Sequence, residues 1–91
     1  MLLNLNVNWR VDVDPFILKT LKRIPRKDAD KIANAIEELA HNPYFGDTHK
    51  LAGQKDAWRR RIGSYRLIYD ISPEEKRVDL YDVLRRGSNT Y

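Results

Sequence analysis

The first part of the chain alternates apolar and polar residues with a period of two. Every odd-numbered position from 3 to 13 is apolar, and the even positions between them carry Asn4, Asn6, Asn8, Arg10 and Asp12. Successive side chains of a β-strand point to opposite faces of a sheet, so this alternation is typical of a strand with one buried face. The pattern predicts a single strand over residues 3–13.

The next segment changes to helical periodicity. Asp14 and Pro15 suit the N-cap and the first helical position, because aspartate accepts a backbone N–H and proline needs no partner for its nitrogen. Apolar residues recur at helical spacing up to Ile24, and Pro25 ends this helix. A second helix follows residues 26–28 and stops at 42–43; its apolar stripe is Ala29, Ile32, Ala33, Ile36, Leu39 and Ala40. Two helices so closely joined should lie antiparallel.

Residues 58–71, WRRRIGSYRLIYDI, predict a β-hairpin. Gly63 and Ser64 separate two runs rich in β-branched and aromatic residues, and glycine at the first loop position suits a type II′ turn. With these two residues as the loop, directly opposed side chains share a face of the sheet. One face then carries Trp58, Arg60, Ile62, Tyr65, Leu67, Tyr69 and Ile71, and the other carries Arg59, Arg61, Arg66 and Ile68.

The second face of this hairpin concentrates three arginines. Like charges opposed across two strands destabilise a sheet by roughly 0.2–1 kcal/mol, and arginine cannot relieve this by losing its proton. An anion would relieve it, and the planar guanidinium fork matches phosphate bidentately. The alternative is a solvated basic face without function, and the hairpin alone does not decide between the two.

Arg60 departs from this pattern, because alternation places it among apolar side chains on the predicted core face. Two explanations are open. Arg60 lies near a sheet edge and extends its charged head to solvent, or the register slips at the turn.

The rest of the chain completes a mixed fold. Residues 44–54 form a turn-rich connection, residues 72–76 form a second turn, and residues 77–84 form the last strand, with apolar positions at Val78, Leu80, Val83 and Leu84. The element order is β-α-α-β-β-β. We therefore predict an α+β domain with a mostly antiparallel sheet, one face covered by the helical hairpin and the arginine-bearing face open.

Composition indicates the class of domain, the kind of partner and the expected location of the protein. The 91 residues are 42% hydrophobic and 33% charged, which predicts a single globular domain over residues 1–91. The net charge of +4, from 17 basic and 13 acidic residues, favours nucleic acid or an acidic protein as partner. The chain has no cysteine, no apolar run that could span a bilayer and no signal-peptide pattern at residues 1–10. We expect a cytoplasmic protein.

In this order and spacing, several segments resemble the RelE/ParE superfamily of bacterial type II toxin–antitoxin toxins. They are KLAG at 50–53, the hairpin at 58–71, above all GSYRLIY at 63–69, and the closing VLRRGSNTY. The resemblance covers essentially the whole chain. It implies a small basic domain that is neutralised by a cognate antitoxin. RelE-type members cleave messenger RNA, typically in the ribosomal A site, whereas ParE-type members poison DNA gyrase and lack the basic catalytic set.

The RelE pattern, carried over residue by residue, implies a catalytic set. Its basic residues on the first hairpin strand fall at Arg59 and Arg61, and its arginine after the turn falls at Arg66. A further arginine falls at Arg86 or Arg85, and a tyrosine near the C-terminus at Tyr91. Two departures are notable. Lysines often stand in the family where this chain has Arg59 and Arg61, and the spacing to Tyr91 is about one residue tighter than in some members.

The implied reaction is attack of the ribose 2′-hydroxyl on the adjacent phosphate, which needs neither metal nor cofactor. The arginines would stabilise the negative charge of the transition state, and Lys50, Lys55 and Arg85 are assigned to RNA binding. Arginine cannot act as a base at neutral pH. Tyr91 is the best candidate, because nearby guanidinium groups should lower its pKa; its other use would be to stack on a nucleobase.

The expected partners are a cognate antitoxin, messenger RNA and the ribosome, with no membrane. Two other functions stay open. One is a ParE-like gyrase poison that binds protein without cutting RNA, and the other is a degenerate member that only binds antitoxin.

Overall fold

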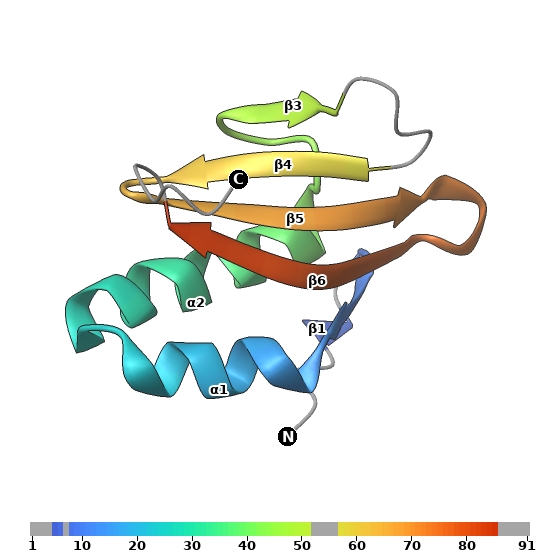
Figure 1. The fold of residues 1–91 in the computed structure, drawn as a ribbon. Helices are drawn as coiled ribbons and strands as arrows, with labels where there is room; N and C mark the ends of the chain where they lie inside the picture. Colours follow the sequence, from blue (N-terminus) through green and yellow to red (C-terminus); the bar gives the residue numbers. More distant parts are fainter. Residues whose placement is uncertain (1–4, 7, 52–56, 86–91) are drawn as a thin grey trace.

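The chain folds into a six-stranded sheet with two helices packed against one face (Figure 1). The structure is a computed structural model that describes residues 5–6, 8–51 and 57–85. The strand order is β1-β2-β6-β5-β4-β3. The strands are β1 (Leu5–Asn6), β2 (Arg10–Val13), β3 (Thr48–Lys50), β4 (Ala57–Ile62), β5 (Tyr65–Ser72) and β6 (Arg77–Arg85). The helices are α1 (Pro15–Arg23), α2 (Arg26–His41) and a short 3-10 turn, η1 (Pro73–Glu75).

The predicted fold class is confirmed. The domain is α+β, its helical hairpin covers one face, and its strand pairs are antiparallel except for β2 with β6, which is parallel. The structure adds two short strands to the predicted order. One is β3, a three-residue edge strand inside the segment that was predicted to be a connection.

The prediction of one strand over residues 3–13 is wrong. Leu5 pairs with Val11 and Asn6 with Arg10, so β1 folds back antiparallel on β2. Between them, the backbone amides of Asn8 and Trp9 both donate to the carbonyl of Ala40, at 3.2 and 2.9 Å. This carbonyl lies in the last turn of α2, where carbonyls lack helical partners. The reversal satisfies it, and alternation cannot reveal a turn that contains no glycine or proline.

Both helices begin and end near the predicted positions. The carboxylate of Asp14 accepts the backbone N–H of Phe16 at 2.9 Å, which caps α1, and Pro15 is its first residue. Pro25 separates the helices, and α2 ends at His41 before Asn42 and Pro43. The fully buried residues of α2 are Ile32, Ala35, Ile36, Leu39 and Ala40, of which only Ala35 lies outside the predicted stripe.

The predicted hairpin register is confirmed at every pair. Trp58 lies opposite Tyr69 and Arg61 opposite Arg66, with Gly63 and Ser64 as the loop. Gly63 has φ +55°, whereas Ser64 does not have a positive φ, which fits a type II′ turn and excludes type I′.

The core lies between the helices and the predicted apolar face of the hairpin. Tyr65, Leu67, Tyr69 and Ile71 are at most 5% exposed there and pack with buried residues of β2, β6 and both helices. Trp58 is half-buried and packs against this core, as predicted. With the core on this side, the opposite face of the sheet stays open, and we call it the outer face.

Candidate functional site

The arginines of the β4–β5 hairpin gather on the outer face. Arg61 lies directly opposite Arg66, and Arg59 lies two residues before Arg61 on the same side of β4. These three residues are called the arginine patch below. The patch lies at the turn end of the hairpin, and the face assignment made from alternation is confirmed.

Neighbouring strands frame the patch with one histidine and two apolar side chains. His49 on β3 is the partner of Arg59, while Leu84 on β6 is the partner of Arg66. Ile68 on β5 lies directly opposite Arg59 and is 9% exposed. His49 was not among the predicted site residues, because a three-residue strand has too few positions to show periodicity.

Asp47 links the patch to the loop before β3. Its carboxylate lies 3.7 Å from Arg61 Nε and 3.1 Å from His49 Nε2, and its carbonyl accepts the Arg61 backbone N–H at 3.0 Å. The Arg61 side chain is 41% exposed. Water screens such an exposed pair strongly, so Asp47 orients the guanidinium and leaves it accessible to an anion.

Arg59 and Arg66 are more enclosed than Arg61, since both are half-buried. Arg59 makes no ion pair with any residue that the structure describes. A partly desolvated cation interacts more strongly with an anion than one in bulk water. The enclosed part of the patch is therefore the better place to bind a phosphate.

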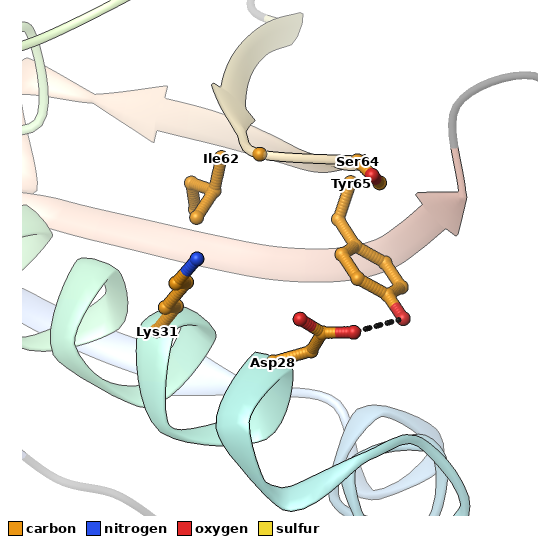
Figure 2. A pocket seen from close by; sticks show the side chains of 6 residues that line it. Asp28, Lys31, Ile62, Ser64 and Tyr65 are labelled. Carbon is orange, nitrogen blue, oxygen red and sulfur yellow. Dashed lines mark hydrogen bonds between the residues drawn. The ribbon is translucent and has the colours of Figure 1, made fainter.

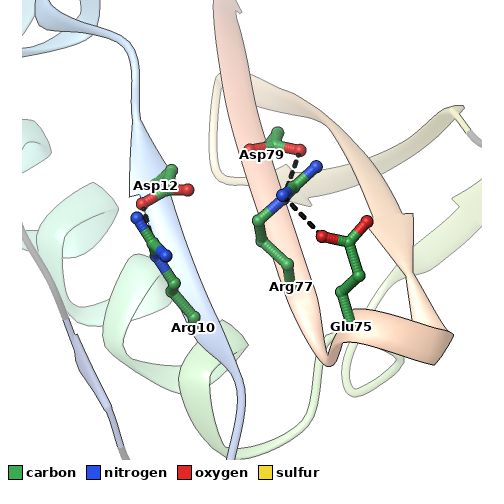
Figure 3. A network of polar contacts seen from close by, with 5 residues as sticks. All are labelled: Arg10, Asp12, Glu75, Arg77 and Asp79. Atoms are coloured by element: carbon green, nitrogen blue, oxygen red, sulfur yellow. Dashed lines mark hydrogen bonds and ion pairs between the residues drawn. The ribbon is translucent and has the colours of Figure 1, made fainter.

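Acidic side chains occupy the other end of the outer face (Figure 3). There Asp79 pairs with Arg77 at 3.1 Å, Glu75 pairs with the same arginine at 2.8 Å, and Asp12 pairs with Arg10 at 3.1 Å. These aspartates therefore pair with arginines far from the hairpin turn. At the η1 end of the outer face, these carboxylates are therefore paired with Arg10 and Arg77 and do not reach the arginine patch.

Arg60 lies on the core side of β4 and is 8% exposed. The register does not slip, and Arg60 is not on the edge strand, because β3 pairs outside it. Its guanidinium reaches across to α2, where Nη2 pairs with the carboxylate of Glu38. It also lies 6.0 Å from the Phe45 ring centroid, with Gly46 beside it. The carboxylate of Glu38 therefore balances the charge of Arg60, and the guanidinium does not reach solvent at a sheet edge.

The described tyrosines with shifted pKa values are poor candidates for a base. Burial is the largest cause that raises the pKa of Tyr65, Tyr69 and Tyr81 above 10.0. The Tyr65 hydroxyl also donates to Asp28 Oδ2 at 3.2 Å, which raises its pKa further (Figure 2). All three side chains stay neutral near pH 7 and cannot accept a proton as phenolates.

The other predicted site residues either lie outside the described residues or belong to the helix-side face of the sheet. Arg86, Tyr91 and Lys55 lie outside the described residues. Lys50 pairs with Trp58 and Arg85 pairs with Tyr65, so both belong to the helix-side face rather than to the outer face. The structure therefore brings Arg59, Arg61 and Arg66 together and does not bring Lys50 or Arg85 to them.

Within residues 5–6, 8–51 and 57–85, no group of three or more histidine, aspartate or glutamate side chains could hold a metal ion. In the same residues, neither helix is long and apolar enough to cross a membrane.

The sequence matches a known toxin family. The profile of the family described as ParE toxin of type II toxin–antitoxin system, parDE, matches residues 11–90. The RelE1 protein of Methanocaldococcus jannaschii is 28% identical in an alignment 83 residues long, which covers 88% of this chain and 92% of that protein.

Solved structures of toxins share the fold. RelE in the RelE–RelB complex of Pyrococcus horikoshii has a TM-score of 0.80 and 26% identity, over 89% of this chain and 98% of that one. The isolated RelE toxin of Escherichia coli has a TM-score of 0.72 and 20% identity, over 92% and 89% of the two chains. The second likeness concerns the fold alone.

Proposed function

The chain belongs to the ParE toxin family of type II toxin–antitoxin systems, within the RelE/ParE superfamily, and on this premise we propose that this RelE-like toxin is an endoribonuclease acting on messenger RNA, on the ribosome. The arginine patch carries the proposal. A gyrase poison that acts by protein contact does not need three guanidinium groups on one open face, whereas a nuclease that needs no metal does.

In the proposed reaction, the ribose 2′-hydroxyl attacks the adjacent phosphorus, and the bond from phosphorus to the 5′-oxygen breaks. The products are a 2′,3′-cyclic phosphate and a free 5′-hydroxyl. The transition state gathers negative charge on the phosphoryl oxygens, and preorganised cations are the main protein contribution to its stabilisation. Arg66 lies opposite the accessible Arg61, and Arg59 lies two residues before Arg61 on β4. In the proposed reaction these two half-buried cations supply the stabilising charge together with Arg61.

Proton transfer is assigned to Tyr91, with Arg86 as the fourth cation. Arg85 is the weaker choice for that role, because it shares the helix-side face with Tyr65. The raised pKa values of Tyr65, Tyr69 and Tyr81 make these three side chains poor bases, which supports the choice of Tyr91 over them.

The proposed protein partner is a cognate antitoxin. The relative from Pyrococcus horikoshii forms a complex with RelB, and the toxins RelE of Escherichia coli and RelE of Mycobacterium tuberculosis are also known in complexes with their antitoxins. The antitoxin would neutralise this chain by masking or displacing its basic groups.

Replacing Arg61 or Arg66 by alanine tests the nuclease proposal. Growth inhibition should be lost in cells that express either variant, while the purified domain keeps its circular dichroism spectrum, because neither side chain belongs to the core. Arg10→Gln is the matched control, since Arg10 lies on the same open side at the acidic end, paired with Asp12. It should remain toxic.

The RNA of the expressing cells decides between the two toxin classes. Cuts within translated codons, absent in the Arg66→Ala variant, would support the proposal. DNA damage with intact RNA would overturn it in favour of gyrase poisoning, and harmless expression of the parent chain would indicate a protein that only binds antitoxin.

A further inference from the structure

A groove lies next to the arginine patch, between α2 and the part of β4 that β3 does not cover. Strand β3 pairs with Trp58, Arg59 and Arg60, so β4 extends past it at Arg61 and Ile62. Arg61 lies on the outer face, yet it also lines the groove between β4 and α2. This one side chain therefore connects the two surfaces.

Cations dominate the groove. Its polar lining consists of Lys31, Asn34 and Glu38 from α2 and of Arg60 and Arg61 from β4. The single carboxylate is paired with Arg60. Lys31 makes no ion pair with the described residues, and its amino group points from the helix toward the hairpin beside Ile62 (Figure 2). The lining thus keeps an excess of positive charge.

Arg60 is a second feature of the groove that favours an anion. The residue is more than nine-tenths buried, and its Nη1 has no hydrogen-bond partner among the residues that the structure describes. A buried guanidinium donor without a partner costs free energy, and an anion nearby reduces that cost.

We propose that this groove binds a phosphodiester of the same RNA strand whose scissile phosphate lies on the arginine patch. Lys31 supplies a point charge, Asn34 an amide donor, and Arg61 spans both phosphates. The inference depends on the proposed nuclease function and extends it, because it gives the RNA a path across the edge of β4. An acidic protein segment has matching charge, but the shared Arg61 makes the groove continuous with the nucleic-acid site.

Binding of labelled RNA to Lys31→Gln tests the path. The probe is a fluorescein-labelled twelve-nucleotide single-stranded RNA with 2′-O-methyl groups, which block the attack. The variant should bind it about five-fold more weakly, and the slope of log Kd against log salt should fall by about 0.7, the change expected for one phosphate contact on a single strand. Cleavage of an unmodified dinucleotide should not change, because it carries only the scissile phosphodiester and has no second phosphate for the groove.

Lys22→Gln is the matched control, since Lys22 is also an exposed lysine, lies on α1 and undergoes the same charge change. Equal effects of the two variants, with RNA binding still lost in Arg66→Ala, would overturn the groove proposal and leave the nuclease proposal intact. Absence of RNA binding in the parent chain would overturn the groove proposal, whereas the nuclease proposal is decided by the cuts in cellular RNA. Unchanged RNA binding with weaker neutralisation by the antitoxin would make the groove a protein interface instead.

Discussion

The guanidinium of Arg60 occupies the space that a side chain at position 46 would need. A Cβ atom built on Gly46 would lie 3.2 Å from the carbon and two nitrogens of that group, closer than ordinary contact. Gly46 also has φ +84°, a left-handed conformation that favours glycine. A side chain at position 46 would therefore require a strained backbone and a shift of the Arg60 guanidinium by a few tenths of an ångström.

Gly46→Ala should destabilise the fold by about 3 kcal/mol, because backbone strain is added to displacement of a guanidinium held by Glu38. Gly63→Ala is the control. Gly63 has φ +55° but no atom within 4 Å of a built Cβ, so strain alone should cost about 1 kcal/mol. Urea denaturation of the two variants measures the difference. Equal losses of stability in the two variants would show that the Arg60 side chain can shift at no cost in free energy.

At the scale of elements, the pair between Arg60 and Glu38 ties β4 to α2. Arg60 alternates along β4 with Arg59 and Arg61, so its anchorage toward the helix fixes which way the two patch arginines point. The side chain of Glu38 is 48% exposed whereas that of Arg60 is 10% exposed. The cost of breaking the pair therefore falls mainly on the arginine.

Glu38→Gln should lower the free energy of unfolding by about 1–2 kcal/mol, because it leaves a buried guanidinium without its counter-charge; exposure of the glutamate keeps the value below that of a fully buried pair. Adding Arg60→Met should restore most of the loss, since an apolar side chain of similar length needs no counter-charge. Glu37→Gln, an exposed neighbour, should change stability by less than about 0.5 kcal/mol. Denaturant midpoints of these variants measure the changes. If the double variant is no more stable than Glu38→Gln alone, the unbalanced charge of Arg60 is not the cause of the loss.

Elements with local signals could be predicted from the sequence, and elements that depend on distant partners could not. Asp14 and Pro25 mark helix ends by their own chemistry, and Gly63 fixes a hairpin register through the turn that it makes. Strands β1 and β3 contain two and three residues, too few for periodicity, and exist only because neighbouring strands pair with them. The reversal at Asn8 likewise depends on a carbonyl of α2.

The same contrast holds for the site in the whole molecule. Alternation across one turn places Arg59, Arg61 and Arg66 on one face, because the register of a two-residue hairpin is local. Asp47 and Lys31 reach the patch and its groove from other elements, and their positions depend on how α2 and the loop pack. Sequence periodicity does not contain that information.

Stability of the whole molecule should fall in alkali. Burial raises the pKa of Tyr65, Tyr69 and Tyr81 above 10.0, and nearby carboxylates of Asp28 and Asp70 add to the rise at Tyr65 and Tyr81. Above pH 10 the unfolded chain loses phenolic protons that the folded chain keeps, so the unfolded state is favoured as pH rises. The stabilisation is complete below pH 10 and is lost as pH passes through the raised values.

Urea midpoints measured between pH 8 and pH 11 check this expectation. The midpoint should decline above pH 10, and Tyr65→Phe should make the decline shallower because one of the three titrating groups is gone. A flat profile in the parent chain would show that the three phenols ionise alike in both states.

The parallel pairing of β2 with β6 also sets the order in which the sheet can assemble. Arg10 on β2 pairs with Arg77 on β6, and most of the chain lies between these two residues in the sequence. Strands β4, β5 and β6 are instead connected to one another by short turns. Closing a long loop costs entropy before any contact compensates for it, so the three-strand meander can nucleate early and β2 can dock only afterwards. The arginine patch lies entirely within the early-forming meander, and docking of the N-terminal strand is the late step that completes the fold around it.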